Sequence, residues 1–408
     1  MGFKVHLDIE KVVHGGYGLA RLSGQVVLVA GALEGETVEV EISEEQGILR
    51  GYMVSCVTAS AERVDTVGLP PTLNLAHATY EAQLRYKHQF VQESLERIGK
   101  LEGQIDETHP SPDRWHYRNT VQYAITDEGV AYRKRKSHSL SIVTEDPVAS
   151  EHIGHLVSKI DIQKLKPAQE MVIRSSFLQQ GVVVTLMGPN ASQLHKAAMH
   201  LVDQGVFGVC VAKADRYRSM EQARLVWGEP YLLERYGNLE LSVSAKGFAQ
   251  INPKSASELY LKALEDAGSG RHALDLYGGA GPIGLHFANH YTKVTVLDTS
   301  HEGLARGQKD AKRLGIANIK YRQGDAEDLP MDIDTLVSDP PRAGMTRETL
   351  IRIGESRADR LIYISCDPAT WARDAATLVS QGWNLQKVTP WDFYPQTSHV
   401  EILSLFTR

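Results

Sequence analysis

The residue with the clearest chemical use is Cys366. It follows a run of apolar and β-branched residues, 360–365, and Asp367-Pro368 comes directly after it. The run predicts a buried strand, which the Asp-Pro pair ends. In open parallel α/β sheets, ligands bind beyond the carboxyl ends of the strands. The thiol is therefore expected at the mouth of a site, where a thiolate can act as a nucleophile. A buried structural cysteine is the alternative.

A glycine-rich turn joins a predicted strand, 273–277, to a predicted helix, 282–289. Glycines let the chain turn tightly and let a ligand approach the backbone. The stretch Gly279-Ala-Gly281-Pro-Ile-Gly284 matches the dinucleotide fingerprint, so an NAD(P)-binding oxidoreductase is one interpretation. Two features favour a cationic ligand without phosphate, such as a sulfonium. Asp275 places a carboxylate in the strand end, and Pro282 removes an N–H that a pyrophosphate would need.

Carboxylates also follow the next predicted strands. Asp298 ends the second strand, where it can hold ribose hydroxyls, as it also would in an NAD site. Asp325 follows the third strand, where it can reach an adenine edge. Asp339-Pro-Pro-Arg342 ends the fourth, and its prolines hold the backbone extended, as a shelf for a planar base requires. Each aspartate alone could be a loop or cap residue. Their series on successive strands carries the argument.

The elements that must position these residues fall into three predicted domains. Alternating strands and helices in 236–408 predict a doubly wound α/β domain of the Rossmann-like kind. Short glycine-punctuated strands in 1–58 predict an OB-type β-barrel, which often binds oligonucleotides but can also be a packing module. Residues 59–235 are expected to form a central α+β domain that binds RNA.

The central domain is expected to begin with a linker, 58–79, and an amphipathic helix, 80–99. The apolar positions of this helix are Leu84, Phe90, Val91, Leu95 and Ile98. Two later segments, 115–125 and 131–137, interleave cations with aromatic side chains, as binders of single-stranded nucleic acid do. From spacing alone, a solvated hairpin is an equal alternative.

Composition sets outer limits on the function. The 408 residues are 42% hydrophobic and 23% charged, which is typical of a globular protein of two or three domains. The net charge of −6 means that RNA binding would need local basic patches. No apolar run reaches about 18 residues and no secretory signal is present, so no membrane association is expected. The three cysteines, Cys56, Cys210 and Cys366, are too few for a four-thiolate metal site and indicate a reducing cytoplasm.

Four ordered motifs closely resemble the RNA 5-methyluridine methyltransferase family, which methylates C5 of uridine in transfer or ribosomal RNA. They are Asp275-Leu-Tyr-Gly-Gly-Ala-Gly, Asp339-Pro-Pro-Arg, Ser365-Cys-Asp-Pro and His399-Val-Glu401. Phe248-Ala-Gln-Ile-Asn252 is similar to the family's Phe-x-Gln-x-Asn segment, and the N-terminal barrel is similar to the TRAM domain of many members. The resemblance covers nearly the whole chain.

The resemblance implies a role for each matching residue. Cys366 would be the nucleophile that adds to C6 of uracil, and Glu401 would be the base that removes the C5 proton. The pocket for S-adenosylmethionine and the base would be lined by Gln250, Tyr277, Gly279, Gly281, Asp298, Asp325 and Asp339. The helix near 80–100 would pack on the catalytic domain. We expect Cys366 and Glu401 on the carboxyl side of neighbouring strands.

The remaining expectations concern the substrate and the departures from the family. The barrel favours 23S ribosomal RNA over transfer RNA, and a monomer is expected. Members with a TRAM domain often bind an iron–sulfur cluster through four cysteines, but Val67–Ala78 contains none, so no cluster is expected. Gly278, Pro282 and Asp367 replace a cysteine and two asparagines of the family pattern. Because Cys366 and Glu401 are both kept, a non-catalytic RNA-binding relative is disfavoured.

Overall fold

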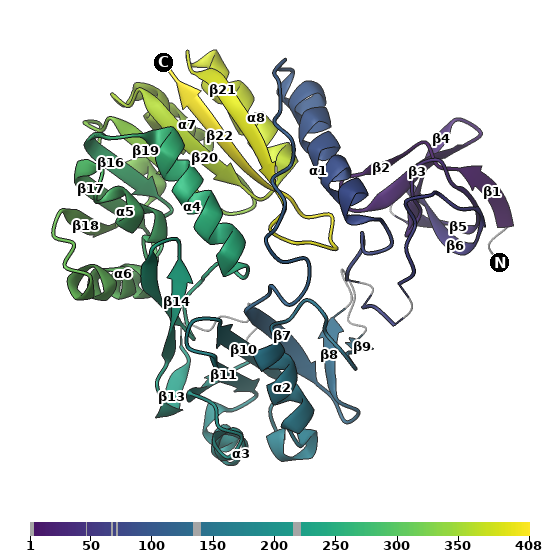
Figure 1. Cartoon of the computed structure of the whole chain (residues 1–408), viewed down its shortest axis with the longest axis horizontal. Helices are drawn as coiled ribbons and strands as arrows, with labels where there is room; N and C mark the ends of the chain where they lie inside the picture. Colours follow the sequence, from purple (N-terminus) through teal and green to yellow (C-terminus); the bar gives the residue numbers. More distant parts are fainter. Residues whose placement is uncertain (1–3, 46, 67, 71, 134–139, 215–221) are drawn as a thin grey trace. The chain divides into compact units, whose positions relative to one another are not determined.

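The computed structural model describes residues 4–45, 47–66, 68–70, 72–133, 140–214 and 222–408 (Figure 1). The chain forms two compact units. The first contains Met1–Ser111, Ser365–Ala376 and Lys387–Ile402, and the second contains Pro112–Ile364, Thr377–Gln386 and Leu403–Arg408. The segments that carry Cys366 and Glu401 therefore belong to the same unit as the N-terminal residues.

The described part of the N-terminal segment forms a curved six-stranded sheet in the order β1-β5-β6-β4-β3-β2. Its strands are β1 Lys4–Asp8, β2 Lys11–Val13, β3 Tyr17–Leu22, β4 Gln25–Ala30, β5 Thr37–Glu45 and β6 Ile48–Thr58. Alternate residues of each strand point into one apolar core, as Val38, Val40 and Ile42 of β5 do. The sequence predicts about five strands here, and the structure adds the short strand β2.

Helix α1, Tyr80–Ser94, belongs to the same unit and continues as a π-helical turn, Leu95–Gly99. The predicted helix is confirmed, but part of its predicted buried face is wrong. The side chain of Ile98 is 47% exposed, whereas Gln83 and Lys87 are buried. Apolar residues of α1 pack in a cluster with residues of the barrel and of the preceding segment: Val12, Leu33, Leu75, Ala78, Ala82, Tyr86 and Phe90.

The segment predicted as a linker, 58–79, is tied down by main-chain hydrogen bonds in its described part. The N–H of Val64 donates to the carbonyl of His77 at 2.9 Å, and the N–H of Thr79 donates to the carbonyl of Glu62 at 2.8 Å. Thr79 also caps α1, because its side chain accepts a hydrogen bond from the N–H of Ala82. The barrel is thus followed by an ordered connection.

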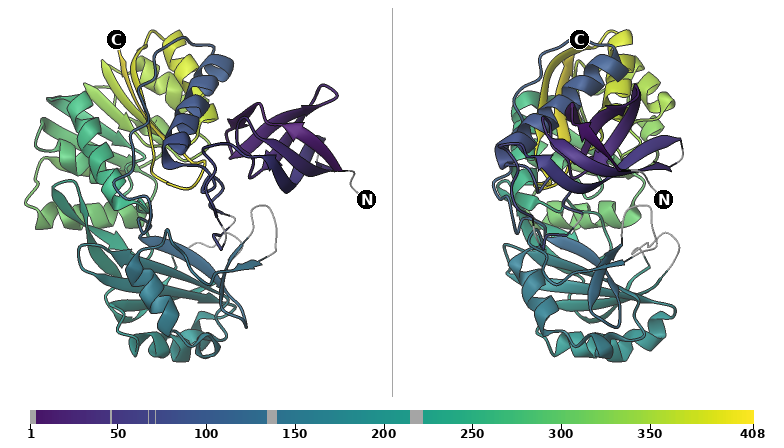
Figure 2. Two further views of the ribbon diagram at one scale, coloured as in Figure 1. Left: turned by 45° about the vertical axis from the view of Figure 1, so that its right-hand side comes forward. Right: turned by 90° about the vertical axis from the view of Figure 1, so that its right-hand side faces the viewer.

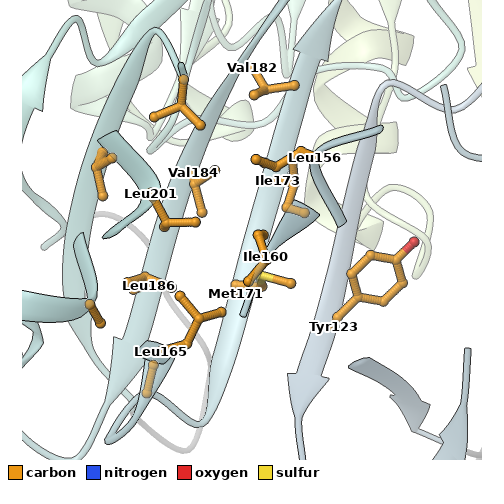
Figure 3. Close-up of a cluster of buried hydrophobic side chains, with 14 of the residues drawn as sticks. Tyr123, Leu156, Ile160, Leu165, Met171, Ile173, Val182, Val184, Leu186 and Leu201 are labelled. Atoms are coloured by element: carbon orange, nitrogen blue, oxygen red, sulfur yellow. The ribbon is translucent and has the colours of Figure 1, made fainter. Parts of the chain in front are cut away.

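The second unit begins with an α+β region whose described strands form a seven-stranded sheet, in the order β13-β12-β11-β10-β7-β8-β9. The strands are β7 Thr120–Ile125, β8 Val130–Arg133, β9 Leu140–Ile142, β10 Glu170–Ser176, β11 Gly181–Gly188, β12 Gly208–Lys213 and β13 Arg224–Gly228. The helices are α2 Glu151–Lys159 and α3 His195–Val202, with short 3-10 turns at Ile162–Leu165 and Ala191–Leu194. Figure 3 shows apolar side chains of β10 and β11, among them Ile173 and Val184, beside Leu156 and Leu201 of the two helices.

The two predicted nucleic-acid segments lie in this region. Within 115–125, the strand begins only at Thr120, because the residues before it make a bridge between Arg118 and Ala149 instead. Within 131–137, the first three residues belong to β8, and residues 134–137 lie outside the described residues. The proposed interleaving of cations and aromatics there is therefore not tested.

After the hairpin β14 Tyr231–Tyr236 and β15 Leu239–Ser244, strands and helices alternate as predicted. They are α4 Pro253–Ala267, β16 Gly270–Leu276, α5 Pro282–Phe287, β17 Tyr291–Asp298, α6 His301–Arg313, β18 Ile319–Gln323, a 3-10 turn Ala326–Asp328, β19 Thr335–Ser338, α7 Arg347–Glu355, β20 Arg360–Ser365, α8 Pro368–Ser380, β21 Asn384–Trp391 and β22 Glu401–Thr407. The described sheet has the order β18-β17-β16-β19-β20-β22-β21. Its strand order reverses beside β16, which is the place where such sheets bind ligands.

Strands β16 to β20 of this sheet are parallel, but β22 runs antiparallel to β20. The N–H of Arg408 donates to the carbonyl of Asp359 at 3.1 Å, and the hydroxyl of Ser404 donates to the carbonyl of Tyr363 at 3.0 Å. Residue numbers on β22 therefore fall as those on β20 rise, which is the pattern of antiparallel pairing. β20 and β22 are neighbours, as expected. The expectation of a carboxyl end is wrong for Glu401, which is the first residue of β22, but the antiparallel direction places this amino end at the edge where β20 ends.

Candidate active site

The glycine turn after β16 has the strained backbone of a ligand loop. Tyr277, Gly279 and Gly281 have φ angles of 61°, 56° and 72°, in the left-handed region. A Cβ atom at Gly281 would lie 2.9 Å from a methyl carbon of Val296, so packing excludes a side chain there. At Gly279, in contrast, no described atom lies within 4 Å of such a Cβ atom. The turn therefore presents open space next to its backbone at Gly279.

Asp298, at the end of β17, holds this turn in place. Its Oδ2 accepts a hydrogen bond from the N–H of Gly279 at 2.9 Å, and its Oδ1 accepts one from the N–H of Ser300 at 2.7 Å. Each carboxylate oxygen has a second lone pair. Asp298 can therefore keep the turn in shape and still accept a hydroxyl donor.

Asp275 is a buried carboxyl at the end of β16. Its Oδ2 accepts a hydrogen bond from the N–H of Gly284 at 2.8 Å, while its buried Oδ1 has no hydrogen-bond partner among the described residues. Burial raises the pKa of Asp275 to about 7. The hydrogen bond from the N–H of Gly284 lowers this pKa, and the negative charges of Asp339 and Asp298 raise it further. A group of this kind gains from a cation placed beside it.

Asp339 and Gln250 meet although they are far apart in the chain. The amide Nε2 of Gln250 donates to Oδ2 of Asp339 at 3.4 Å. Desolvation raises the pKa of Asp339 to about 7, and the Gln250 bond opposes that rise. Gln250 is itself buried, and its carbonyl accepts a hydrogen bond from the hydroxyl of Tyr236 at 3.4 Å. Two residues earlier, the ring of Phe248 is 85% exposed.

Two predicted residues have other surroundings. Tyr277 directs its hydroxyl to the hydroxyl of Thr349, at 3.4 Å. Asp325 is exposed at the start of the 3-10 turn that follows β18. Hydrogen bonds thus join Gly279 with Asp298 and Gln250 with Asp339, while Asp325 takes part in neither group.

In the first unit, Cys366 directly follows β20 and is partly exposed. The next residue, Asp367, directly precedes helix α8. Its Oδ1 accepts hydrogen bonds from the N–H groups of Ala369 at 3.1 Å and Thr370 at 3.0 Å. The thiol therefore lies just before a capped helix end, where partial positive charge favours an anion. Because aspartate and asparagine cap helices equally well, the departure from the family pattern at Asp367 has a structural explanation.

Glu401 is buried, with 3% of its surface exposed, and it is the first residue of β22. Arg408 pairs with Asp359 through the main chain. Glu401 lies seven residues before Arg408, and Cys366 lies seven residues after Asp359. If the antiparallel register continues, Glu401 comes opposite Cys366.

Three family models match the chain. The TRAM domain matches residues 2–49, the methyltransferase small domain matches 238–354, and the tRNA (uracil-5-)-methyltransferase model matches 321–408. An uncharacterised RNA methyltransferase of Thermosynechococcus vestitus is 30% identical over 446 positions, covering 100% of this chain and 98% of the relative. One of Halalkalibacterium halodurans is 28% identical, covering 98% of this chain and 96% of the relative.

The chain belongs to the RNA uracil-5-methyltransferase family. As a member, it is an S-adenosylmethionine-dependent RNA (uracil-5-)-methyltransferase with an N-terminal TRAM domain. The NAD(P)-binding oxidoreductase that the glycine pattern left open is thereby set aside. A solved structure shows the same fold: the tRNA (uracil-54, C5)-methyltransferase of Pyrococcus abyssi, in complex with S-adenosyl-L-homocysteine, has a TM-score of 0.78 and 22% identity. It covers 98% of this chain, which in turn covers 100% of it.

Among the described residues, no group of three or more cysteine, histidine, aspartate or glutamate side chains is placed to hold a metal ion. Cys56 lies on β6, Cys210 is buried in β12 and Cys366 follows β20, and none of the three forms a disulfide. Between the barrel and α1, the described residues place a largely buried ion pair, in which Arg63 donates to Glu36 at 2.6 Å. None of the helices in the described part of this methyltransferase is long and apolar enough to span a membrane.

Residues that sequence reasoning missed lie on α1. Gln83 and Lys87 are buried and reach the loop before Glu401, as described below. The signal was their spacing of four residues, which places both on one helix face between buried aromatic positions. A polar pair on an otherwise apolar face indicates specific partners.

Proposed function

We propose that this methyltransferase uses Cys366 as its nucleophile and Glu401 as its general base. The observation that supports the proposal is the antiparallel pairing of β20 with β22, whose register, if continued to the strand ends, would bring the two residues to opposite positions. The reaction needs one thiol and one carboxylate on the same ring, and the ends of β20 and β22 carry one of each, the partly exposed Cys366 and the buried Glu401.

The mechanism follows from the electronics of uracil. C5 is too weak a nucleophile to take a methyl group unaided. The Cys366 thiolate adds to C6, the C5–C6 π electrons move toward C5 and the C4 carbonyl, and C5 becomes enolate-like. S-adenosylmethionine, when bound, would supply an electrophilic methyl group. C5 forms a bond to this carbon as the bond from the carbon to the sulfonium sulfur breaks, and the sulfur keeps the electron pair. Glu401 then takes the C5 proton, the C5–C6 double bond forms again, and the thiolate leaves.

We propose that the residues around the glycine turn hold S-adenosylmethionine. Open space at Gly279 gives the ligand access to the backbone, and Gly281 shapes the turn. Asp298 would bind ribose hydroxyls, Asp325 the adenine edge, and Tyr277 with Gln250 and Asp339 would line the pocket toward the base. The unpartnered oxygen of Asp275 and the raised pKa values of Asp275 and Asp339 support a cationic ligand.

The target uridine must leave its stack to reach Cys366, at a cost of a few kcal/mol that is least in a loop. We propose that 1–58 and 59–235 bind the RNA and that 236–408 carries out the transfer, in a monomer. The barrel favours 23S ribosomal RNA as the substrate, whereas the name of the Pyrococcus enzyme favours transfer RNA. Nucleoside mass spectrometry of both RNAs from a deletion strain, mapped by position, distinguishes the two.

The test of the mechanism uses RNA with 5-fluorouridine at the target. Because fluorine cannot leave as the C5 proton does, the enzyme should stay covalently attached to the RNA, and denaturing gels should show the adduct. Cys366→Ala should form no adduct. Cys56→Ala, a matched control at a partly exposed cysteine on β6, should form it normally. An adduct with Cys366→Ala would remove this residue from the mechanism.

A further inference from the structure

The loop between β21 and β22 leads directly into Glu401 and belongs to the first unit (Figure 2). Its residues from Asp392 to Val400 are buried except Tyr394 and His399, which are partly exposed. Gln396, near its middle, has a φ angle of 70°, in the left-handed region that a non-glycine residue rarely adopts. Such a conformation persists only where surrounding contacts impose it.

Gln83 of α1 makes some of the contacts that hold Gln396 in this conformation. Its side chain is 1% exposed and makes three hydrogen bonds. Its Oε1 accepts from the main-chain N–H of Gln396 at 2.9 Å, and its Nε2 donates to the side-chain Oε1 of Gln396 at 2.9 Å and to the carbonyl of Ala78 at 3.0 Å. One amide thus binds both the backbone and the side chain of the strained residue.

Lys87, one turn later on the same face, holds the beginning of the loop. Its ammonium group pairs with the carboxylate of Asp392 and donates to the carbonyl of Tyr394 at 3.1 Å. Both side chains of the pair are 0% exposed. A buried lysine is costly unless it is paired, so the pair strongly favours the one loop path that keeps both bonds.

The segment before α1 holds the end of the loop. Asn74 accepts a hydrogen bond from the N–H of Ser398 at 2.9 Å and donates to its hydroxyl at 3.0 Å. The N–H of Leu75 donates to the carbonyl of Gln396 at 3.0 Å. The start, the middle and the end of the loop are therefore each held by hydrogen bonds or an ion pair from residues 74–87.

We propose that Gln83, Lys87 and Asn74 are positioning residues for catalysis, which aim the carboxylate of Glu401 by fixing the loop before it. The inference rests on the proposed role of Glu401 as the base. A base must lie within hydrogen-bond reach of the proton that it removes, and misplacement by about 1 Å can cost about 100-fold in rate. The three side chains act through main-chain and loop groups and do not touch the reacting atoms.

A matched set of variants separates this role from general stability. Gln83→Ala removes the bonds to Gln396, whereas Gln92→Ala on the same helix removes only an exposed bond to Glu96. We expect Gln83→Ala to lower kcat roughly tenfold or more, with the KM for S-adenosylmethionine unchanged. Because proton removal is the impaired step, the covalent enzyme–RNA adduct should accumulate on ordinary RNA substrate, as it should in Glu401→Gln. Gln92→Ala should behave as wild type.

Each outcome has one meaning. If Glu401→Gln turns over normally, the proposed base is wrong. If Glu401→Gln accumulates adduct but folded Gln83→Ala keeps its kcat, or loses kcat without accumulating adduct, the positioning role is wrong. Asn74→Ala, which lies outside the helix and loses the bonds to Ser398, decides by the same criteria if Gln83→Ala does not fold.

Discussion

Two carboxyl groups of the proposed cofactor pocket are poised to change charge near neutral pH. Burial raises the pKa of Asp275 and of Asp339 to about 7 in each case. At pH 6 both groups are mainly protonated and neutral, and at pH 8 both are mainly ionised. A sulfonium cation interacts favourably with the ionised forms only. Binding of such a ligand should therefore strengthen as the pH rises through 7.

We expect the Kd for S-adenosylmethionine to fall by up to about tenfold between pH 6 and pH 8 for each of the two carboxyls that must ionise, because a group with a pKa of about 7 goes from mainly neutral to mainly ionised over this range. Isothermal titration calorimetry measures this directly. S-adenosylhomocysteine is the matched control, since its sulfur is neutral, and its Kd should change less. Equal pH dependence for the two ligands would contradict the assignment of these carboxyls to the cation.

Helix α8 is preceded by the cap residue Asp367, which directly follows the proposed nucleophile Cys366. Asp367 accepts two hydrogen bonds from N–H groups of the first turn. Asp367→Ala should cost about 1 kcal/mol in the free energy of unfolding, measured by urea denaturation. Asp367→Asn restores the residue type that the family pattern contains and should be nearly neutral. A loss as large for asparagine as for alanine would show that capping is not the role of Asp367.

The elements differ in how far the sequence predicts them. The start of helix α4 follows from local signals, because the side chain of Asn252 caps it and Pro253 suits its first turn. The direction of β22, which places Glu401 at its amino end, depends on pairing with β20. No residue pattern within β22 itself predicts this direction. The apolar pattern of α1 predicts only part of its buried face. Gln83 and Lys87 are polar, and their burial is favourable only because Gln396 and Asp392, distant in the sequence, pair with them.

Within the first unit, a largely buried ion pair connects the N-terminal barrel with the segment before α1. Glu36 has a side-chain exposure of 0% and accepts from Nε and Nη2 of Arg63, each at 2.6 Å, and from the N–H of Leu33 at 2.8 Å. Burial alone would raise the pKa of Glu36, but the Arg63 and main-chain hydrogen bonds outweigh it and lower the pKa. The pair thus cross-links the barrel to the segment before α1.

Arg63→Leu should therefore lower the free energy of unfolding by about 3 kcal/mol at pH 7, because it leaves a buried carboxylate without its cation. Arg85→Leu, which breaks the exposed ion pair with Glu62, should cost less than about 1 kcal/mol. The lowered pKa of Glu36 contributes stability above the unfolded pKa of about 4.3, and this contribution is lost as the pH falls through the folded pKa. In the Arg63→Leu variant, protonation of Glu36 also removes the buried charge that has lost its partner, so this variant is destabilised less at low pH. Urea denaturation should thus show the difference in unfolding free energy between wild type and Arg63→Leu narrowing below about pH 4. A difference that stays constant from about pH 5 to about pH 3 would show that the stability of this cross-link does not come from the charge of Glu36.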